Sequence, residues 1–383
     1  MRPHVLAAAT MVFGDDYYAG RRETVCLSGF AQLNKWPMPG FKHRVDEQGY
    51  ASFDVELISA PEVGIKGYSY ELEDRIQVLP NPLLPSTGQV RQIVPGKNFP
   101  AHVHLRRFGI LETSTLRLAH RDVIDTHGVV DSVPPFTRPL SGPYLGHPRG
   151  DGPFDIAQAP GVLHATNLPG AWYPADDENE PVGHTPAAFF APSASPFMTM
   201  MVDPSMIMQV ALEGRLGLEV GGKTVKVDLA GDYRQAAGAE ILLFGPEKHS
   251  EGSGVQAQLA RLAVVGHCAE LGGRVMLRVS WPRPSGGTLG DGDEDSLSRL
   301  KFPGDLHFGA HFELCTPSGT LYAATSMRLA GKLSDLDPRG SELHTEGADA
   351  PLVNTDGQGK ARLTEVQLVM RDAHVGEHAA VNI

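Results

Sequence analysis

Apolar and polar residues alternate along much of this chain, and no long apolar stripe with the 3.6-residue spacing of a helix is present. The clearest example is the segment 50–59, YASFDVELIS, in which Phe53, Val55 and Leu57 face one way. With 43 glycines and 30 prolines, the composition favours short elements joined by turns. The pattern predicts a mainly β protein with little helix, built as β-sandwiches or β-barrels of many short strands.

The chain is 383 residues long, which is more than one ordinary core accommodates, and we expect two domains. A loop-rich stretch over 134–186 carries many prolines and glycines, with an acidic patch at 176–180. Loops of this length mark a junction between domains or a covering segment. We therefore expect an N-terminal β domain over residues 1–175 and a C-terminal β domain over residues 176–383, with the boundary inside the loop-rich stretch.

Residues 99–135 resemble residues 302–338, which suggests a tandem repeat. Both segments begin with Phe-Pro and share a histidine, a glycine and a closing proline. The matched residues of the first segment are Phe99, Pro100, His104, Leu111, Thr113, Thr115, Leu116, Gly128 and Pro135. Their counterparts are Phe302, Pro303, His307, Leu314, Thr316, Thr320, Leu321, Gly331 and Pro338. The alignment needs two compensating shifts of two residues, so chance stays open as the other explanation.

Glycine ends an apolar–polar run in three separate segments, 26–29, 211–214 and 328–331. A glycine inside a strand usually marks a bulge or a close approach between backbones. The segments therefore predict such places, although a β-rich chain with this much glycine also produces similar runs by chance.

The formal net charge of -12 argues against nucleic acid or an anionic membrane as the partner, because phosphate groups bind to a basic surface. No apolar run is long enough to span a bilayer, and we interpret the run 5–13 as a first strand rather than a secretion signal. Three widely spaced cysteines, Cys26, Cys268 and Cys315, are typical of free thiols in a reducing compartment. These features predict a cytoplasmic protein whose partner is a small-molecule ligand or a further copy of the chain.

Histidines at alternating positions provide the first candidate site. His102 and His104 are separated by one residue, so on a strand their rings project from the same face and can share a metal ion. A third ligand has to come from another strand, and His164, in the segment PGVLHATN over 160–167, is the candidate. We therefore predict one divalent transition metal held by His102, His104 and His164.

These two histidine segments resemble the two sequence motifs of the cupin superfamily. Gly96, His102 and His104 match the start of the first motif, a glycine followed after five residues by His-x-His, and the segment 160–167 is similar to the second motif. Glu112 lies further from His104 than the glutamate of the first motif, and the closing glycine of that motif is absent. The resemblance implies a β-barrel that holds Fe, Mn, Zn or Ni and carries out dioxygenase, isomerase or decarboxylase chemistry.

A second histidine cluster lies in the later similar segment. His307, His311 and Glu313 share one face of a strand and need a fourth group, such as His344, to hold a metal. The acidic segment 291–296 lacks the glycine and the glutamate of a calcium loop, so we interpret it as a solvated linker.

Two functions of different class follow from these patterns. The first is a small-molecule-binding or -converting β-barrel protein, in its most specific form a metal-dependent enzyme with Glu112 or His120 as the acid–base partner. The alternative is a non-catalytic β-sandwich protein that acts through self-assembly or by binding another protein. The glycine- and proline-rich loops and the absence of a complete catalytic signature in the sequence favour this alternative.

Overall fold

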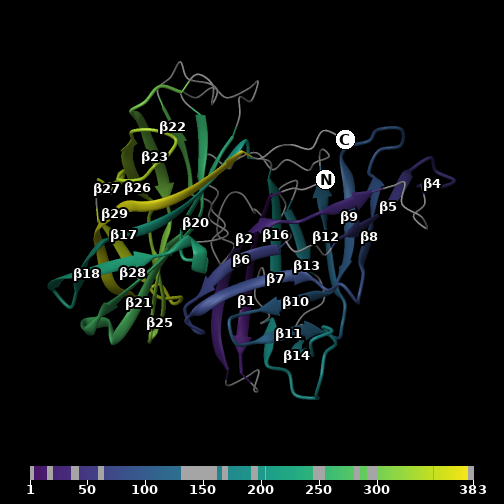
Figure 1. Ribbon diagram of the computed structural model, residues 1–383, viewed down its shortest axis with the longest axis horizontal. Coiled ribbons are helices and arrows are strands. Elements are labelled where there is room, and N and C mark those ends of the chain that lie inside the picture. Colours follow the sequence, from purple (N-terminus) through teal and green to yellow (C-terminus); the bar gives the residue numbers. More distant parts are fainter. Residues whose placement is uncertain are drawn as a thin grey trace. The chain divides into compact units, whose positions relative to one another are not determined.

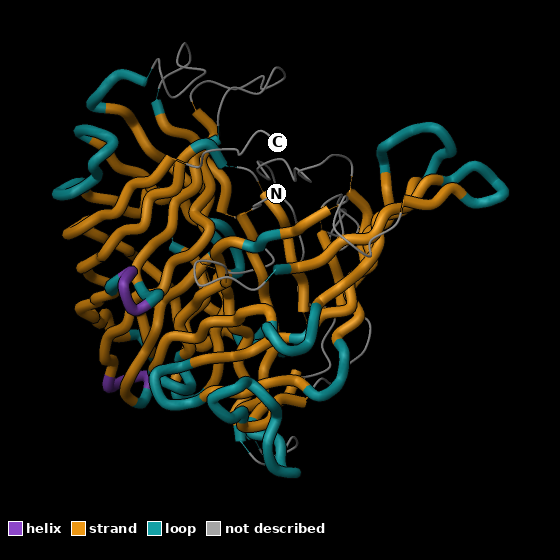
Figure 2. The backbone as a smooth tube through the Cα atoms, turned by 45° about the vertical axis from the view of Figure 1, so that its right-hand side comes forward, coloured by secondary structure: helices purple, strands orange, loops and turns teal. Residues whose placement is uncertain are grey.

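The computed structural model of the chain describes residues 4–14, 20–35, 43–58, 64–130, 162–165, 171–190, 197–202, 204–244, 255–279, 285–290, 300–347 and 349–377. Strands dominate these residues, and their helical segments are two 3-10 turns, Tyr233–Gln235 and Ala269–Leu271 (Figure 2). The prediction of a mainly β protein with little helix is confirmed. No helix within these ranges has the length and apolar character needed to cross a membrane.

The strands fall into two compact units, the first holding β1 to β16 and the second β17 to β29. The junction that we expected between residues 175 and 176 lies between β14 (Ala171–Pro174) and β15 (Ala188–Phe190), and these strands pair with each other. The change of unit comes later, between β16 (Phe197–Val202) and β17 (Met206–Val220). The proline-rich stretch therefore contains strands that complete the first unit.

The second unit is a closed antiparallel barrel in which each strand pairs with its neighbours in the chain. Its last strand, β29 (Gly359–Glu377), runs beside its first, β17, and the two pair along most of their length (Figure 1). Between them the remaining strands follow in chain order. They are β18 (Lys223–Gly231) with β19 (Gly238–Leu243), β20 (Val255–Cys268), β21 (Gly273–Val279) with β22 (Ser285–Leu289), β23 (Gly304–Ala310) with β24 (Phe312–Thr316), β25 (Gly319–Ala323) with β26 (Met327–Leu333), and β27 (Glu342–Glu346) with β28 (Ala350–Val353).

The first unit repeats this plan. Its first strand, β1 (His4–Phe13), pairs with both β15 and β16, which together form the last strand and close the barrel. A short strand, β4 (His43–Val45), is added beside β5. The intervening strands are β2 (Arg21–Phe30) with β3 (Leu33–Lys35), β5 (Ala51–Leu57) with β6 (Gly64–Ser69), β7 (Asp74–Pro80) with β8 (Ser86–Gln92), β9 (Ala101–Arg107) with β10 (Gly109–Glu112), β11 (Arg117–His120) with β12 (Ile124–Val130), and β13 (Val162–Ala165) with β14. When the two pieces joined by "with" are taken as one interrupted strand, and β15 and β16 likewise, the described residues of each barrel form eight strands.

The two similar sequence segments form the same hairpin in each barrel. Leu111 lies opposite Leu118 in the first barrel, and Leu314 lies opposite Leu321 in the second. Both pairs are related by a separation of 203 positions (302 minus 99, for the two initial phenylalanines). The structure thus relates the two segments by one constant separation, without the two compensating shifts. The alignment of Thr115 with Thr320 in the sequence departs from this separation and was displaced by two residues. The Phe-Pro bond that opens each segment is cis in both barrels.

Alternation along the strands fills the second barrel with apolar side chains. On β23 and β24, five such residues at every second position are fully or almost fully buried. They are Leu306, Phe308, Ala310, Phe312 and Leu314. The residues that alternate with them on β23, Asp305, His307 and Gly309, are exposed or half-buried on the outer face. The interior of this barrel is therefore a packed core, as in other small barrels.

Glycines inside strands occur where neighbouring backbones approach closely, as the three glycine-ended segments predict. A Cβ atom on Gly29 would collide with the carbonyl oxygen of Gly64, and one on Gly214 would collide with that of Gln367. A Cβ atom on Gly331 would meet the carbonyl oxygen of Glu342 in the same way. Because these obstacles are backbone atoms of a paired strand, they cannot rotate aside.

Gly214→Ala should lower the free energy of unfolding by about 2 kcal/mol, because the added methyl group forces the β17–β29 closure apart. Gly309→Ala is the matched control, since the nearest atom to its Cβ position is the Gly286 oxygen at an ordinary contact distance of 3.9 Å. Urea denaturation of both variants measures the difference. Equal stability of the two variants would contradict the close-approach account.

Candidate functional site

His102 and His104 lie on the outer face of the first barrel. On β9 the alternate residues Ala101, Val103 and Leu105 are buried in the barrel interior, whereas the two histidines between them are exposed. The His104 side chain is 54% exposed, and its Nε2 lies 3.2 Å from Asp125 Oδ1. The two histidines thus share a face, and that face is directed to solvent.

Strand pairing places three histidines at consecutive register positions of neighbouring strands. His104 of β9 lies opposite His127 of β12, and His127 lies opposite His164 of β13. His102 lies two residues along β9, opposite Val129. His127 was not among the residues predicted for the site, although its place in an alternating strand was a usable signal. We call His104, His127 and His164 the histidine row.

The other members of the predicted site lie elsewhere or outside the described residues. Glu112 ends β10, where its Oε1 lies 3.3 Å from Arg117 Nε. It is eight residues beyond His104 along the same composite strand, about 25 Å at the usual rise per residue. Pro160 and Asn167 of the second cupin-like motif, and the acidic segment 291–296, fall outside the described residues. Among the described side chains, no three His, Cys, Asp or Glu residues are arranged to hold a metal ion as they stand.

The residues of the second predicted cluster each contact a different partner. Glu313 is buried, and its Oε2 lies 2.8 Å from Arg278 Nε. His307 is half-buried on the outer face, where Thr288 Oγ1 lies 3.3 Å from its Nε2. His344 lies on β27 and its Nε2 is 3.6 Å from Glu346 Oε1. The carboxylate of Glu313 is therefore already committed to an ion pair.

His120, the second acid–base candidate, lies inside the first barrel among other polar side chains. It follows the phase of Leu118 on β11, which points into the core. Arg107 continues the inward phase of Val103 and Leu105 on β9. Thr126 on β12 and Trp172 on β14 also lie in the inward phase of their strands. We call Arg107, His120, Thr126 and Trp172 the interior polar cluster.

The second barrel has small or apolar residues at the matched positions. The correspondence follows from the shared register, with Trp172 opposite His120 as Leu352 is opposite Ala323. The matched residues of the second barrel are Ala310, Ala323, Leu329 and Leu352. Four hydrogen-bonding side chains thus occupy one region of the first barrel where the same scaffold elsewhere is apolar.

Trp172 packs against His120 in this region and fills the space beside Gly109. Its ring contacts the His120 imidazole edge to face, with ring centroids 3.6 Å apart and an interplanar angle of 70°. A Cβ atom on Gly109 would lie 3.0 Å from Trp172 Cη2, which is tighter than ordinary packing. In the second barrel the position matched to Gly109 holds Phe312. Gly109 therefore leaves the space into which the indole ring extends.

Burial determines the charge of the interior polar cluster. The pKa of His120 is lowered to about 3, first by burial and then by the positive charge of Arg107, against a backbone hydrogen bond with Asp122 that raises it. Burial lowers the pKa of Arg107 to about 10, so its guanidinium stays charged at neutral pH. Part of Arg107 reaches the surface, but its Nε and Nη2 atoms are buried. The cluster thus combines one cation with a neutral imidazole.

Thr126 adds a hydroxyl group to the cluster. The residue is fully buried, and its Oγ1 has no hydrogen-bond partner in the part of the chain that the structure describes. A buried hydroxyl without a partner costs about 1–3 kcal/mol. Groups of this kind are expected where a ligand or an ordered water supplies the missing bond.

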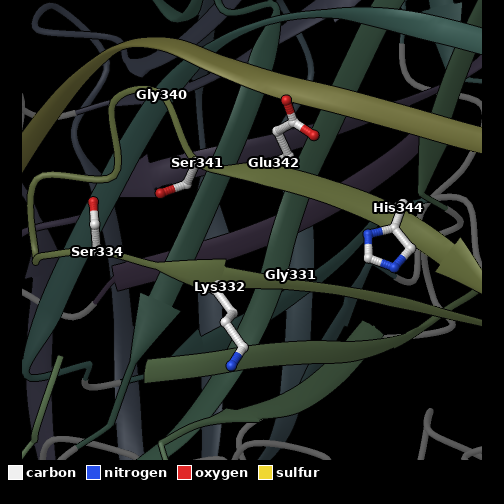
Figure 3. Close-up of a pocket in the computed structure, with 7 residues that line it drawn as sticks. All are labelled: Gly331, Lys332, Ser334, Gly340, Ser341, Glu342 and His344. Atoms are coloured by element: carbon white, nitrogen blue, oxygen red, sulfur yellow. The ribbon is translucent and has the colours of Figure 1, made fainter. Parts of the chain in front are cut away.

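A polar hollow lies on the outer face of the second barrel, between β26 and β27 (Figure 3). Its volume is about 420 Å³. Its lining residues are Gly331, Lys332, Ser334, Gly340, Ser341, Glu342 and His344. Lys332 Nζ lies 3.5 Å from Asp305 Oδ1, and in the figure the Lys332 and His344 side chains lie well apart from each other. The charged groups of the hollow do not converge on one point.

The chain belongs to a family described as "Family of unknown function (DUF6004)", whose model matches residues 1–383. No curated protein matches the chain. Among solved structures, one is similar in part, titled "Structure of DynF from the Dynemicin Biosynthesis Pathway of Micromonospora chersina". It is 17% identical, with a TM-score of 0.36, and the match covers 44% of this chain and 81% of the DynF chain.

The low pKa of His120 predicts a loss of stability in acid. Unfolding releases the imidazole to its ordinary pKa, so between about pH 6.5 and pH 3 the unfolded chain binds a proton that the folded chain does not. The free energy of unfolding should therefore fall by up to about 1.4 kcal/mol per pH unit from this residue alone. Urea denaturation at pH 7 and pH 5 should show a smaller loss in His120→Gln than in the unsubstituted protein, and equal losses would refute the assignment.

Proposed function

We propose that the first barrel binds a small organic anion in its interior and that the second barrel is its closed, packed companion. The observation that carries the proposal is the interior polar cluster, set against the apolar residues at the matched positions of the second barrel. Both barrels satisfy the same strand pairing, so folding alone does not require these four polar side chains. Buried polar groups are costly, and their concentration in one region supports a binding role.

The chemistry of the cluster favours an anion. All four side chains carry hydrogen-bond donors: a charged guanidinium, a neutral imidazole with one N–H, a hydroxyl and an indole N–H. Arg107 is charged at neutral pH, and its Nε and Nη2 atoms are buried, where attraction for a negative group is stronger than in water. A guanidinium binds a carboxylate through two parallel hydrogen bonds, so a carboxylate is the natural partner.

The surroundings of the cluster favour a ligand with an apolar body. Leu105, Leu111, Leu118 and Ile124 line the same interior and are almost fully buried. The indole face of Trp172 offers a surface for stacking. An eight-stranded barrel has room for its own side chains or for one small ligand. These limits support an organic acid of the size of a substituted single or double ring rather than a polymer.

Binding of 2-naphthoate should depend on Arg107. We expect the untagged protein to bind this carboxylate at least ten times more tightly than the neutral 2-naphthol or the cationic 2-naphthylmethylamine, because only the carboxylate pairs with the guanidinium. Arg107→Gln should weaken naphthoate binding at least tenfold, which corresponds to about 1.4 kcal/mol, and should change naphthol binding little. Isothermal titration calorimetry measures all three probes.

Thr126→Val is the second variant, because it removes the hydroxyl and keeps the side-chain shape. It should weaken naphthoate binding and leave the far-ultraviolet circular dichroism unchanged. Equal affinity for the three probes, or naphthoate binding that Arg107→Gln and Thr126→Val both leave unchanged, would contradict an anion site in the barrel.

A further inference from the structure

We propose that the histidine row on the outer face of the first barrel is a binding site for a divalent transition-metal ion. His104 and His127 are its ligands among the described side chains, and His164 lies opposite His127 in the strand register. The site is separate from the interior polar cluster, because outward and inward side chains alternate along β9 and β12. It differs from the sequence prediction by the inclusion of His127 in place of His102.

Strand pairing provides the necessary distances. Residues directly opposite each other in an antiparallel pair have Cβ atoms about 4.5–5.5 Å apart. Two imidazoles at this separation can turn towards one ion at the usual distance of about 2.0–2.1 Å between zinc and nitrogen. His104 and His127 are both exposed, so their rings can rotate into this arrangement without disturbing the core. His102 is offset along the strand and lies opposite Val129, which places it at the margin of the row.

Asp125 supports His104 in this role. Its Oδ1 lies 3.2 Å from His104 Nε2 and 3.9 Å from Arg106 Nε. A carboxylate that accepts a hydrogen bond from one ring nitrogen orients the ring and makes the other nitrogen a better metal ligand. With Nε2–H held by Asp125, the Nδ1 atom of His104 is the nitrogen available to the ion.

The second barrel contains the same row without its central histidine. Its matched residues are His307, Ala330 and His344, which lie opposite one another in that order. Ala330 has no ligating group, so the two flanking histidines are separated by a full strand. His307 instead contacts Thr288, and His344 contacts Glu346. The protein therefore carries a natural comparison in which one residue distinguishes a three-histidine row from an incomplete one.

The ligand set indicates which ions the row prefers. Neutral imidazoles suit Zn²⁺, Cu²⁺ and Ni²⁺, whereas Mg²⁺ and Ca²⁺ prefer oxygen ligands. We therefore expect Zn²⁺ and Cu²⁺ to bind and Mg²⁺ to have no effect at the same concentration. Because an imidazole nitrogen must be unprotonated to coordinate, protons and the metal ion compete for the same nitrogen atoms.

The test is calorimetric titration of the untagged full-length protein with Zn²⁺ alone. His104→Ala and His127→Ala should each weaken binding at least tenfold. His102→Ala and His307→Ala, which remove exposed or half-buried histidines outside the row, should stay within about twofold of the unsubstituted protein. Electron paramagnetic resonance of the Cu²⁺ form should show nitrogen coupling that His127→Ala reduces.

A gain-of-site variant tests the row even if a loss variant is destabilised. Ala330→His completes the second row and should add about one Zn²⁺ per chain. Unchanged Zn²⁺ affinity in His127→Ala, or no added site in Ala330→His when its circular dichroism matches that of the unsubstituted protein, would overturn the proposal.

Discussion

Closure of each sheet on itself is the constraint on which the rest of the structure depends. In the second barrel, β29 pairs with β17 from Met206 to Glu219, with irregularities after Ala211 and Gly217 that let the long strands bend. In the first barrel, β1 is completed by β15 at one end and by β16 at the other. Closure pairs the first strand with the last, so in the described part of each barrel neither of them is left as a free edge. It also gives each residue a fixed assignment to the interior or the outer face, so strand phase decides which side chains can meet.

The shared register shows which residues of the two barrels correspond, so residues common to both can be distinguished from those found in one barrel only. At positions that are buried in the core of both barrels, the matched residues are of the same type, as Leu111 and Leu314 are. Where the matched residues differ, the first barrel has the interior polar cluster in its interior and the additional histidine of the histidine row on its outer face. The inner difference supports an anion site and the outer difference a metal site, and each can be tested against its counterpart in the same molecule. The second barrel, with its apolar interior, serves as the reference.

The sequence predicted the class of fold well and the site only in part. Alternating residues such as those of 50–59 are a direct consequence of strand geometry, so the β class could be read from them. The interior polar cluster was missed, apart from His120, because its members are close only after four separate strands pair. One signal was available: Arg107 follows Val103 and Leu105 in the inward phase, and an arginine in that phase is unusual. The junction was misplaced because proline and glycine also occur between strands of one barrel, as β14 and β15 show.

A crystal structure of the untagged protein grown with 2-naphthoate would test the anion site in the first barrel. We expect electron density for the carboxylate within hydrogen-bond distance of the Arg107 guanidinium and the Thr126 hydroxyl, with the rings against Trp172. Density for naphthoate only on an outer face, with the interior of the first barrel filled by protein side chains as in the second, would contradict it.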